Sequence, residues 1–270
     1  MKKKQQFLSY RRAGEIKLKC SIRLDQLFET DMERKKFEEK WGEFKKAKYN
    51  SDLYRKKGNV LQYDSEQLIP SIKSRKLPLL LVFGNPAGQS VLNGMFFSFE
   101  GDGKEHRMWR SILEKSKLLE LQKEKGSNLK KMNASRRKRM LSLDYESKFR
   151  IGMSVFITMP SPADGKWGGV AGVKRLLGAR AFRRLEAAER DRVIEIAKGF
   201  IKRKGAVVAF QKNAWDALRR DSDQPYRISE ARACKLKGTV RGTKTPLFGV
   251  PPTRLTNPCR DALAIQLGKI

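Results

Sequence analysis

The chain has 270 residues, and its 60 Lys and Arg outnumber its 29 Asp and Glu, which leaves a formal net charge of +31. Such an imbalance predicts a polyanionic partner, above all nucleic acid, because neutralised phosphates release counterions. The alternative, a solvated surface adapted to heat or salt, usually adds Glu alongside Lys. Three widely spaced cysteines argue against a disulfide framework, a structural zinc site or an iron–sulfur cluster, and a single histidine excludes a histidine pair.

No apolar segment approaches 18 residues, and the first residues, "MKKKQQFLSYRR", lack the apolar region of a signal peptide. We therefore expect a cytoplasmic protein, associated with the nucleoid if the source is prokaryotic, without membrane contact. We also expect a monomer that uses no cofactor and no metal.

Residues 1–75 are dense in Lys and Arg and are predicted to form a basic, helical N-terminal extension. Apolar residues recur at helical spacing between Leu24 and Phe44, which predicts an amphipathic helix over 25–48. Within it, Trp41 and Phe44 are interpreted as packing residues.

Residues 76–270 are predicted to form one α/β domain. The run "LPLLLVF" at 77–83 is typical of a strand buried on both faces. Strands separated by helical stretches favour a central four-stranded parallel sheet flanked by helices. The other strands are expected at 154–158, 206–211 and 245–250. Helices are expected from 104, over 181–204, from 213 and over 259–267, and a basic loop is expected at 123–140.

The loops that follow parallel strands meet at one edge of a sheet, where ligands bind. After the first strand comes Gly84-Asn85-Pro86. Gly permits a sharp turn and Pro ends strand pairing, so the Asn85 amide is held rigidly and can orient one water molecule. A plain turn is the alternative, since Asn-Pro is a common turn dipeptide.

Aromatic residues follow about ten positions later, at Phe96, Phe97 and Phe99. Rings on a loop suit stacking on a nucleobase, although such rings are more often core residues. A water-holding amide, a stacking ring and a basic surface together favour an enzyme that flips one base out of a duplex.

These residues resemble the uracil-DNA glycosylase superfamily, whose first motif is G-x-N-P-G in its mismatch-specific and single-strand-selective branches. The stretch "FGNPAG" at 83–88 matches Asn85-Pro86 to that motif, and "GMFFSFEGDGKEHRMW" at 94–109 follows the order of the aromatic segment. The resemblance implies that Asn85 positions the attacking water, that Phe97 stacks on the base and that Trp109 is a core residue. It implies a three-layer sandwich over residues 77–267.

The chain departs from the family in two places. After the fourth strand the family has H-P-S-P or N-P-S-x, whereas this chain has "GVPPTRLTNP" at 249–258, with Val250 or Pro251 at the polar position. After the second strand, Thr158 and Met159 stand where the classical branch reads uracil with Asn. The stretch "MPSP" at 159–162 resembles the last motif in spelling but follows the wrong strand.

The main hypothesis is a monofunctional DNA glycosylase that hydrolyses the N-glycosidic bond of a deaminated or damaged base, with uracil favoured. The alternatives are a non-catalytic DNA- or RNA-binding protein on the same fold and a ribosome-associated protein. His106 is interpreted as a helix-start residue or a phosphate or base contact. Candidate base contacts are Gly84, Pro86, Phe96, Phe97, Thr158, Met159 and Asp164. Candidate DNA contacts are Arg136, Arg137, Lys138, Arg139, Lys166, Pro251, Pro252, Thr253, Arg254, Leu255 and Thr256.

Overall fold

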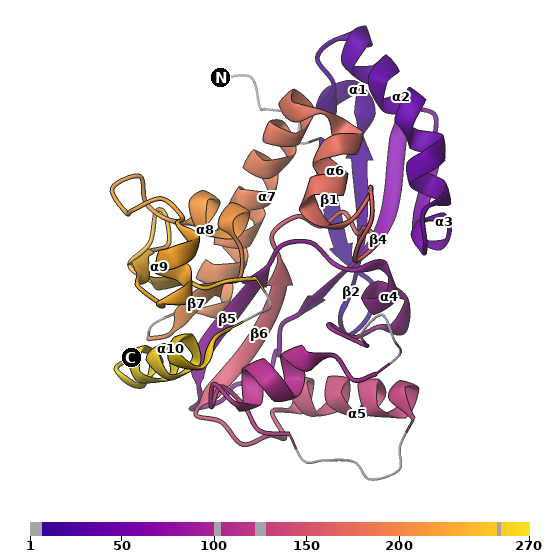
Figure 1. The fold of residues 1–270 in the computed structure, drawn as a ribbon. Coiled ribbons are helices and arrows are strands. Elements are labelled where there is room, and N and C mark those ends of the chain that lie inside the picture. The colour runs from indigo at the N-terminus through magenta and orange to yellow at the C-terminus, as the bar shows by residue number, and fades with distance from the viewer. Residues whose placement is uncertain (1–6, 100–103, 122–127, 203, 253–254) are drawn as a thin grey trace. The chain divides into compact units, whose positions relative to one another are not determined.

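The computed structural model describes residues 7–99, 104–121, 128–202, 204–252 and 255–270, and these residues form a mixed α/β protein (Figure 1). The chain folds into two compact units. Unit 1 comprises Met1–Gln67, Asn85–Phe96 and Ile157–Glu189, and unit 2 comprises Leu68–Gly84, Phe97–Phe156 and Arg190–Ile270. Each unit is therefore assembled from three separate segments, and neither ends at the predicted boundary after residue 75.

Unit 1 contains an antiparallel sheet in the order β1-β2-β4-β3. Side chains alternate along β2, so that Leu18, Cys20 and Ile22 are buried on one face while Lys17 and Lys19 are exposed on the other. The prediction of a helical extension is therefore wrong for these segments, because lysines that alternate with apolar residues form strands. The strands are β1 (Leu8–Arg12), β2 (Lys17–Arg23), β3 (Tyr54–Lys57) and β4 (Val60–Leu68).

The predicted N-terminal helix is present as α2 (Asp31–Lys46). It begins at Thr30, whose side chain accepts a hydrogen bond from the backbone N–H of Glu33, a normal N-cap. Trp41 and Phe44 pack against the ring of Tyr54, which confirms their packing role. The other helices that lie wholly in unit 1 are α1 (Leu24–Leu27), α3 (Asn50–Leu53), α4 (Gly88–Asn93) and α6 (Gly169–Leu177).

Unit 2 contains the parallel strands. They pair in the order β6-β5-β7-β9, side by side as Figure 1 shows for β5 and β6, and an antiparallel strand β8 follows β9. Continuous burial along β5 and β7 confirms that these strands are covered on both faces. The strands are β5 (Leu77–Phe83), β6 (Phe149–Val155), β7 (Ala206–Ala209), β8 (Leu236–Thr239) and β9 (Pro246–Gly249).

The long helix α7 (Ala179–Phe200) contributes residues to both units. In unit 2 the predicted helices from 213 and over 259–267 are present, and the one expected from 104 begins later, as a π-helix. The helices are η1 (Met108–Glu114), α5 (Leu129–Ser142), α8 (Lys212–Leu218), α9 (Ile228–Arg232) and α10 (Asn257–Gly268).

Two predictions for unit 2 are wrong. Residues 129–140 of the predicted basic loop belong to α5, whose N-cap is Asn128. The side chain of Asn128 accepts a hydrogen bond from the N–H of Lys131. The second strand begins at Phe149 rather than Ser154, because Arg150 and Gly152 interrupt its apolar pattern. Gly152 lies where a Cβ would come within 3.0 Å of Ile69 and 3.1 Å of the Phe200 ring, so the glycine permits close packing there.

Candidate active site

The carboxyl ends of the parallel strands lie in register. The N–H of Phe156 donates to the carbonyl of Phe83, that of Phe210 to Val82 and that of Val250 to Ala209, at 2.7, 2.8 and 3.0 Å. The residues that directly follow β6, β7 and β9 therefore meet at one edge of the sheet of unit 2, as predicted for parallel strands.

The Phe97 ring stands edge-on to Phe83, the last residue of β5, with ring centroids 4.7 Å apart. The His106 ring is tilted against the Phe97 ring, with the ring centroids 4.9 Å apart. The backbone of Phe97 has φ 51°, a left-handed conformation that a Phe rarely adopts. Its carbonyl accepts a hydrogen bond of 3.0 Å from the indole of Trp109. A half-buried ring is thus held at the strand end in a strained backbone, an arrangement that is common at binding sites.

The neighbours of Phe97 have structural roles. Trp109 is buried, as predicted for a core residue. His106 lies two residues before η1, where its Nδ1 accepts a hydrogen bond of 3.1 Å from the N–H of Met108. Phe96 is also buried, and this leaves no free ring face for a base.

Gly84 and Gln211 lie against one another at the same strand ends. A Cβ at Gly84 would lie 2.0 Å from the Oε1 of Gln211, so only glycine permits this approach. Within the described chain the half-buried Gln211 amide has no hydrogen-bond partner. An amide offers both a donor and an acceptor, the combination that pairs with a base edge. Sequence reasoning missed Gln211, although its place directly after the third apolar run was a usable signal.

Asn85 follows Gly84 and belongs to unit 1. Its Nδ2 donates to the carbonyl of Met159 at 3.1 Å and to the Oγ of Ser161 at 2.8 Å. A carbonyl only accepts, so the nitrogen of the Asn85 amide must face Met159. The remaining oxygen, Oδ1, has no partner among the described residues and is the free acceptor of a half-buried side chain.

The backbone around Asn85 is fixed by the same segment. The N–H of Ser161 donates to the carbonyl of Pro86 at 3.1 Å, and the N–H of Gly88 donates to the carbonyl of Ser161 at 3.0 Å. Tyr54 donates its hydroxyl to the carbonyl of Pro160 at 2.5 Å. The "MPSP" stretch is therefore the support of Asn85, a role that its spelling did not indicate.

Thr158 is buried and engaged within the protein. Its N–H donates to Glu189 at 2.6 Å, and its hydroxyl contacts both Glu189 and the hydroxyl of Tyr63. Burial raises the pKa of the Tyr63 hydroxyl well above its usual value, so Tyr63 stays a neutral partner. Thr158 and the buried Met159 side chain are therefore not free to contact a base.

Asp164 and Lys166 are exposed on the following loop of unit 1. Lys166 forms a 2.6 Å ion pair with Glu43, whose other oxygen accepts from the indole of Trp167. The hydrogen bond from Lys166 holds the pKa of Glu43 below its usual value. Lys166 remains more than half exposed at 57%, which leaves room for a phosphate contact.

The described residues of the loop after β9 are mostly apolar. Val250 and Pro251 are buried, and Leu255 is only 7% exposed, so the Leu255 side chain is not free to contact DNA as predicted. Thr256 is the N-cap of α10, where its side chain accepts from the N–H of Cys259 at 3.3 Å. Pro252 is exposed. Thr253 and Arg254 lie outside the described residues.

The four predicted basic contacts on α5 differ in exposure. Arg136 is buried over the Trp109 ring, with 5.1 Å from its guanidinium carbon to the ring centroid, and it pairs with Glu105. Burial lowers the pKa of Arg136 to about 10. Arg136 is therefore a packing residue. Lys138 is exposed, and Arg137 and Arg139 are partly exposed.

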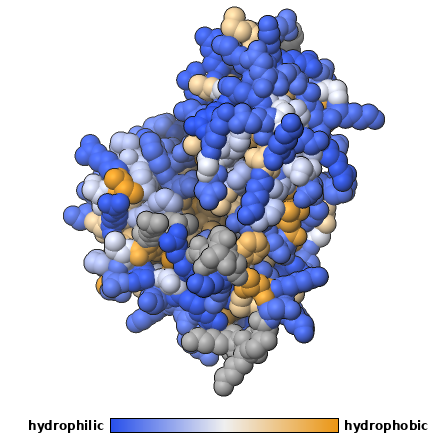
Figure 2. Space-filling view, turned by 45° about the vertical axis from the view of Figure 1, so that its right-hand side comes forward, coloured by the Kyte–Doolittle hydropathy of each residue, from blue (hydrophilic) through white to orange (hydrophobic). Residues whose placement is uncertain are grey.

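Most of the described surface visible in Figure 2 is hydrophilic, in keeping with the composition. Within the described ranges, no three or more His, Cys, Asp or Glu side chains gather where they would hold a metal ion. The helices that the structure describes are all too short or too polar to cross a membrane. A scan against models of protein families and a search of curated proteins both found no match for this chain.

Proposed function

We propose that the chain is a monofunctional DNA glycosylase of the uracil-DNA glycosylase type that hydrolyses the N-glycosidic bond of a deaminated base, with uracil favoured. The observation that carries the proposal is the orientation of the Asn85 amide. Both of its hydrogens are donated, to Met159 and to Ser161, which leaves Oδ1 to accept a hydrogen bond from water. The parallel pairing of β6, β5, β7 and β9 is the pairing that this fold requires.

In the proposed reaction the water oxygen held by Asn85 bonds to the sugar carbon C1′ as the bond from C1′ to the base nitrogen breaks. The base leaves as an anion and takes a proton from solvent, and the water loses one proton. Orientation of the nucleophile is the contribution of the protein, and it is commonly worth several kcal/mol of barrier. The phosphates of the DNA help to stabilise the cationic sugar.

Within unit 2, the Phe97 ring is assigned to stack on the flipped base, a contact worth about 1–3 kcal/mol per base. The Gln211 amide is assigned to the edge of the base, because Thr158 is engaged elsewhere. The basic surface supplies phosphate contacts, and Lys138 and Lys166 are the predicted contacts that are exposed lysines.

A second candidate function is a non-catalytic nucleic-acid-binding protein on the same fold. It is favoured by the buried Val250 and Pro251, which stand where the related enzymes have a polar residue. The binding protein would keep the basic surface and would leave every base attached.

One experiment separates the two functions. Purified protein is incubated with oligonucleotides that each carry one uracil, hypoxanthine, xanthine or mismatched thymine, and alkali-labile abasic sites are measured. The glycosylase predicts strand breaks at one or more of these bases, with uracil foremost. Tight binding with no abasic site from any substrate supports the binding protein instead.

A further inference from the structure

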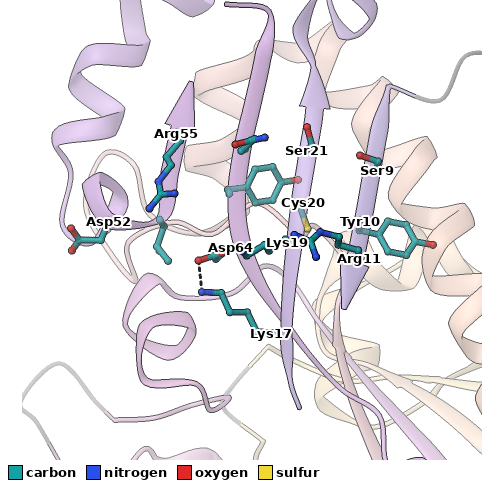
Figure 3. Close-up of a pocket in the computed structure, with 13 residues that line it drawn as sticks. Ser9, Tyr10, Arg11, Lys17, Lys19, Cys20, Ser21, Asp52, Arg55 and Asp64 are labelled. Atoms are coloured by element: carbon teal, nitrogen blue, oxygen red, sulfur yellow. Dashed lines mark ion pairs between the residues drawn. The ribbon is translucent and has the colours of Figure 1, made fainter. Parts of the chain in front are cut away.

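A basin lies on the exposed face of the antiparallel sheet of unit 1 and has a volume of about 470 Å³ (Figure 3). Its side chains come from all four strands and from α3, which contributes Asp52 and Leu53. The residues that the strands present on this face are polar. We call them the basic sheet face: Ser9, Arg11, Lys17, Lys19, Ser21, Arg55, Gln62 and Asp64. Tyr10 and Tyr63 also border the basin, but the strand register aligns both with Cys20, on the opposite face of the sheet.

The strand register places like charges opposite one another on this face. Arg11 of β1 is the direct partner of Lys19 of β2. Like charges at directly opposite positions destabilise a sheet. One acidic residue, Asp64, lies opposite Lys19, but it forms its ion pair with Lys17, at 2.6 Å. The repulsion between Arg11 and Lys19 destabilises the folded protein, and an anion bound above this face would relieve it.

Several other cations of unit 1 pair with carboxylates. Such ion pairs at 2.5 to 2.8 Å include Lys56–Glu38, Lys166–Glu43, Arg184–Glu29 and Arg184–Glu33. On the basic sheet face, by contrast, Arg11, Lys19 and Arg55 have no acidic partner among the residues that the structure describes. Three unmatched cations thus share one face.

We propose that the basic sheet face binds the phosphate backbone of a DNA strand. Arginine donates in a fork that fits phosphate oxygens, and lysine adds a point charge. A row of neutral donors, Ser9, Ser21 and Gln62, runs across the sheet to Arg55 in register, and it suits further phosphate oxygens. The face lacks an aromatic platform, so it contacts the backbone rather than the bases. The choice of DNA among polyanions rests on the proposed function, whereas the site itself rests on the charges.

The test compares two triple variants with the same change of charge. The first is Arg11→Thr, Lys19→Thr and Arg55→Thr, in which Thr keeps a good strand former. The control is Lys235→Thr, Lys237→Thr and Lys244→Thr, which removes three exposed lysines of unit 2. Affinity for single-stranded DNA, and for RNA of the same sequence, is measured from about 50 to 200 mM salt. Thermal unfolding of both variants is followed in parallel.

For the first variant, we expect the slope of log DNA affinity against log salt concentration to become shallower by about 2 to 3, and DNA binding to be at least tenfold weaker. For the control, we expect the same slope to change by less than about 1. The first variant is expected to unfold at or above the wild-type temperature, because the repulsion between Arg11 and Lys19 is relieved. Saturating DNA should also protect Lys19 of the wild type from acetylation.

Equal slopes in the two variants, or unprotected Lys19, would overturn the site. Tighter binding of RNA, lost in the first variant, would overturn the assignment to DNA. These outcomes are independent of catalysis. If the wild type excises no base but the salt slopes differ as predicted, the basic sheet face remains supported and only the glycosylase function is refuted. If the wild type excises bases but the two variants have equal salt slopes, only the basic sheet face is refuted.

Discussion

The loops after β5 and β9 both follow buried parallel strands, but their polar groups differ. After β5, Asn85 is held by Met159 and Ser161, and its amide oxygen is left as an acceptor. After β9, Val250 and Pro251 are buried. One loop therefore holds an oriented polar side chain, whereas Val250 and Pro251 of the other loop pack inside the protein. Under the proposed function, the contrast predicts that excision depends on Asn85 and not on the side chains of Val250 or Pro251.

The largest expected effect comes from Asn85→Ala. Loss of the oriented amide should lower single-turnover excision by roughly a hundredfold or more, with DNA affinity unchanged within a few-fold, because the phosphate contacts lie elsewhere. The matched control is Asn93→Ala, which removes an amide whose hydrogen bond, among the residues that the structure describes, goes to the carbonyl of Gln89 in α4. If Asn85→Ala excised bases at the wild-type rate, the proposed difference between the two loops would be wrong.

The next largest effect is expected from Phe97→Ala. Lost stacking of about 1–3 kcal/mol corresponds to a fall of about 5- to 150-fold in kcat/KM. Phe97→Tyr should keep most of the activity, because the ring stays. Phe99→Ala, two residues along, serves as the control, and an equal loss there would argue against a specific base contact of Phe97.

Val250→Asn tests the loop after β9 through stability. A buried amide without partners should lower the free energy of unfolding by about 1–3 kcal/mol in urea, and excision should not rise. Val170→Asn, at a half-buried position of α6, should change the free energy of unfolding much less. Faster excision by Val250→Asn at unchanged stability would mean that this loop accepts the polar residue of the family.

The smallest effect concerns Glu66 of β4, a buried carboxyl with an unpartnered oxygen. Burial raises its pKa well above the usual value, so the folded protein prefers the neutral form. Stability should therefore fall as pH rises from the carboxyl pKa of the unfolded chain toward the raised value. Glu66→Gln should be more stable than the wild type near pH 8 and similar near pH 4. If the free energies of unfolding of the wild type and of Glu66→Gln change with pH in the same way over this range, Glu66 is not the cause of the pH dependence.

The sequence predicted β5 to the residue, as well as the presence of the other three parallel strands, because uninterrupted apolar runs have few alternatives. It missed the antiparallel sheet, where lysines alternate with apolar residues in β2, and α5, whose buried face includes Arg136. That the Asn85 side chain is held in place was predictable from the Gly-Asn-Pro turn. The orientation of its amide was not, because the acceptors lie 74 and 76 residues away along the chain.

In the proposed reaction, the Asn85 amide acts through the orientation that Ser161 helps to fix. A double-mutant cycle of Asn85→Ala and Ser161→Ala, read by single-turnover excision with saturating protein, tests it most directly. Ser161→Ala alone should slow excision by roughly three- to tenfold, the worth of one hydrogen bond. Ser161→Ala should not slow excision further in the Asn85→Ala background. An equal loss in both backgrounds would contradict it, because Ser161 would then act without Asn85.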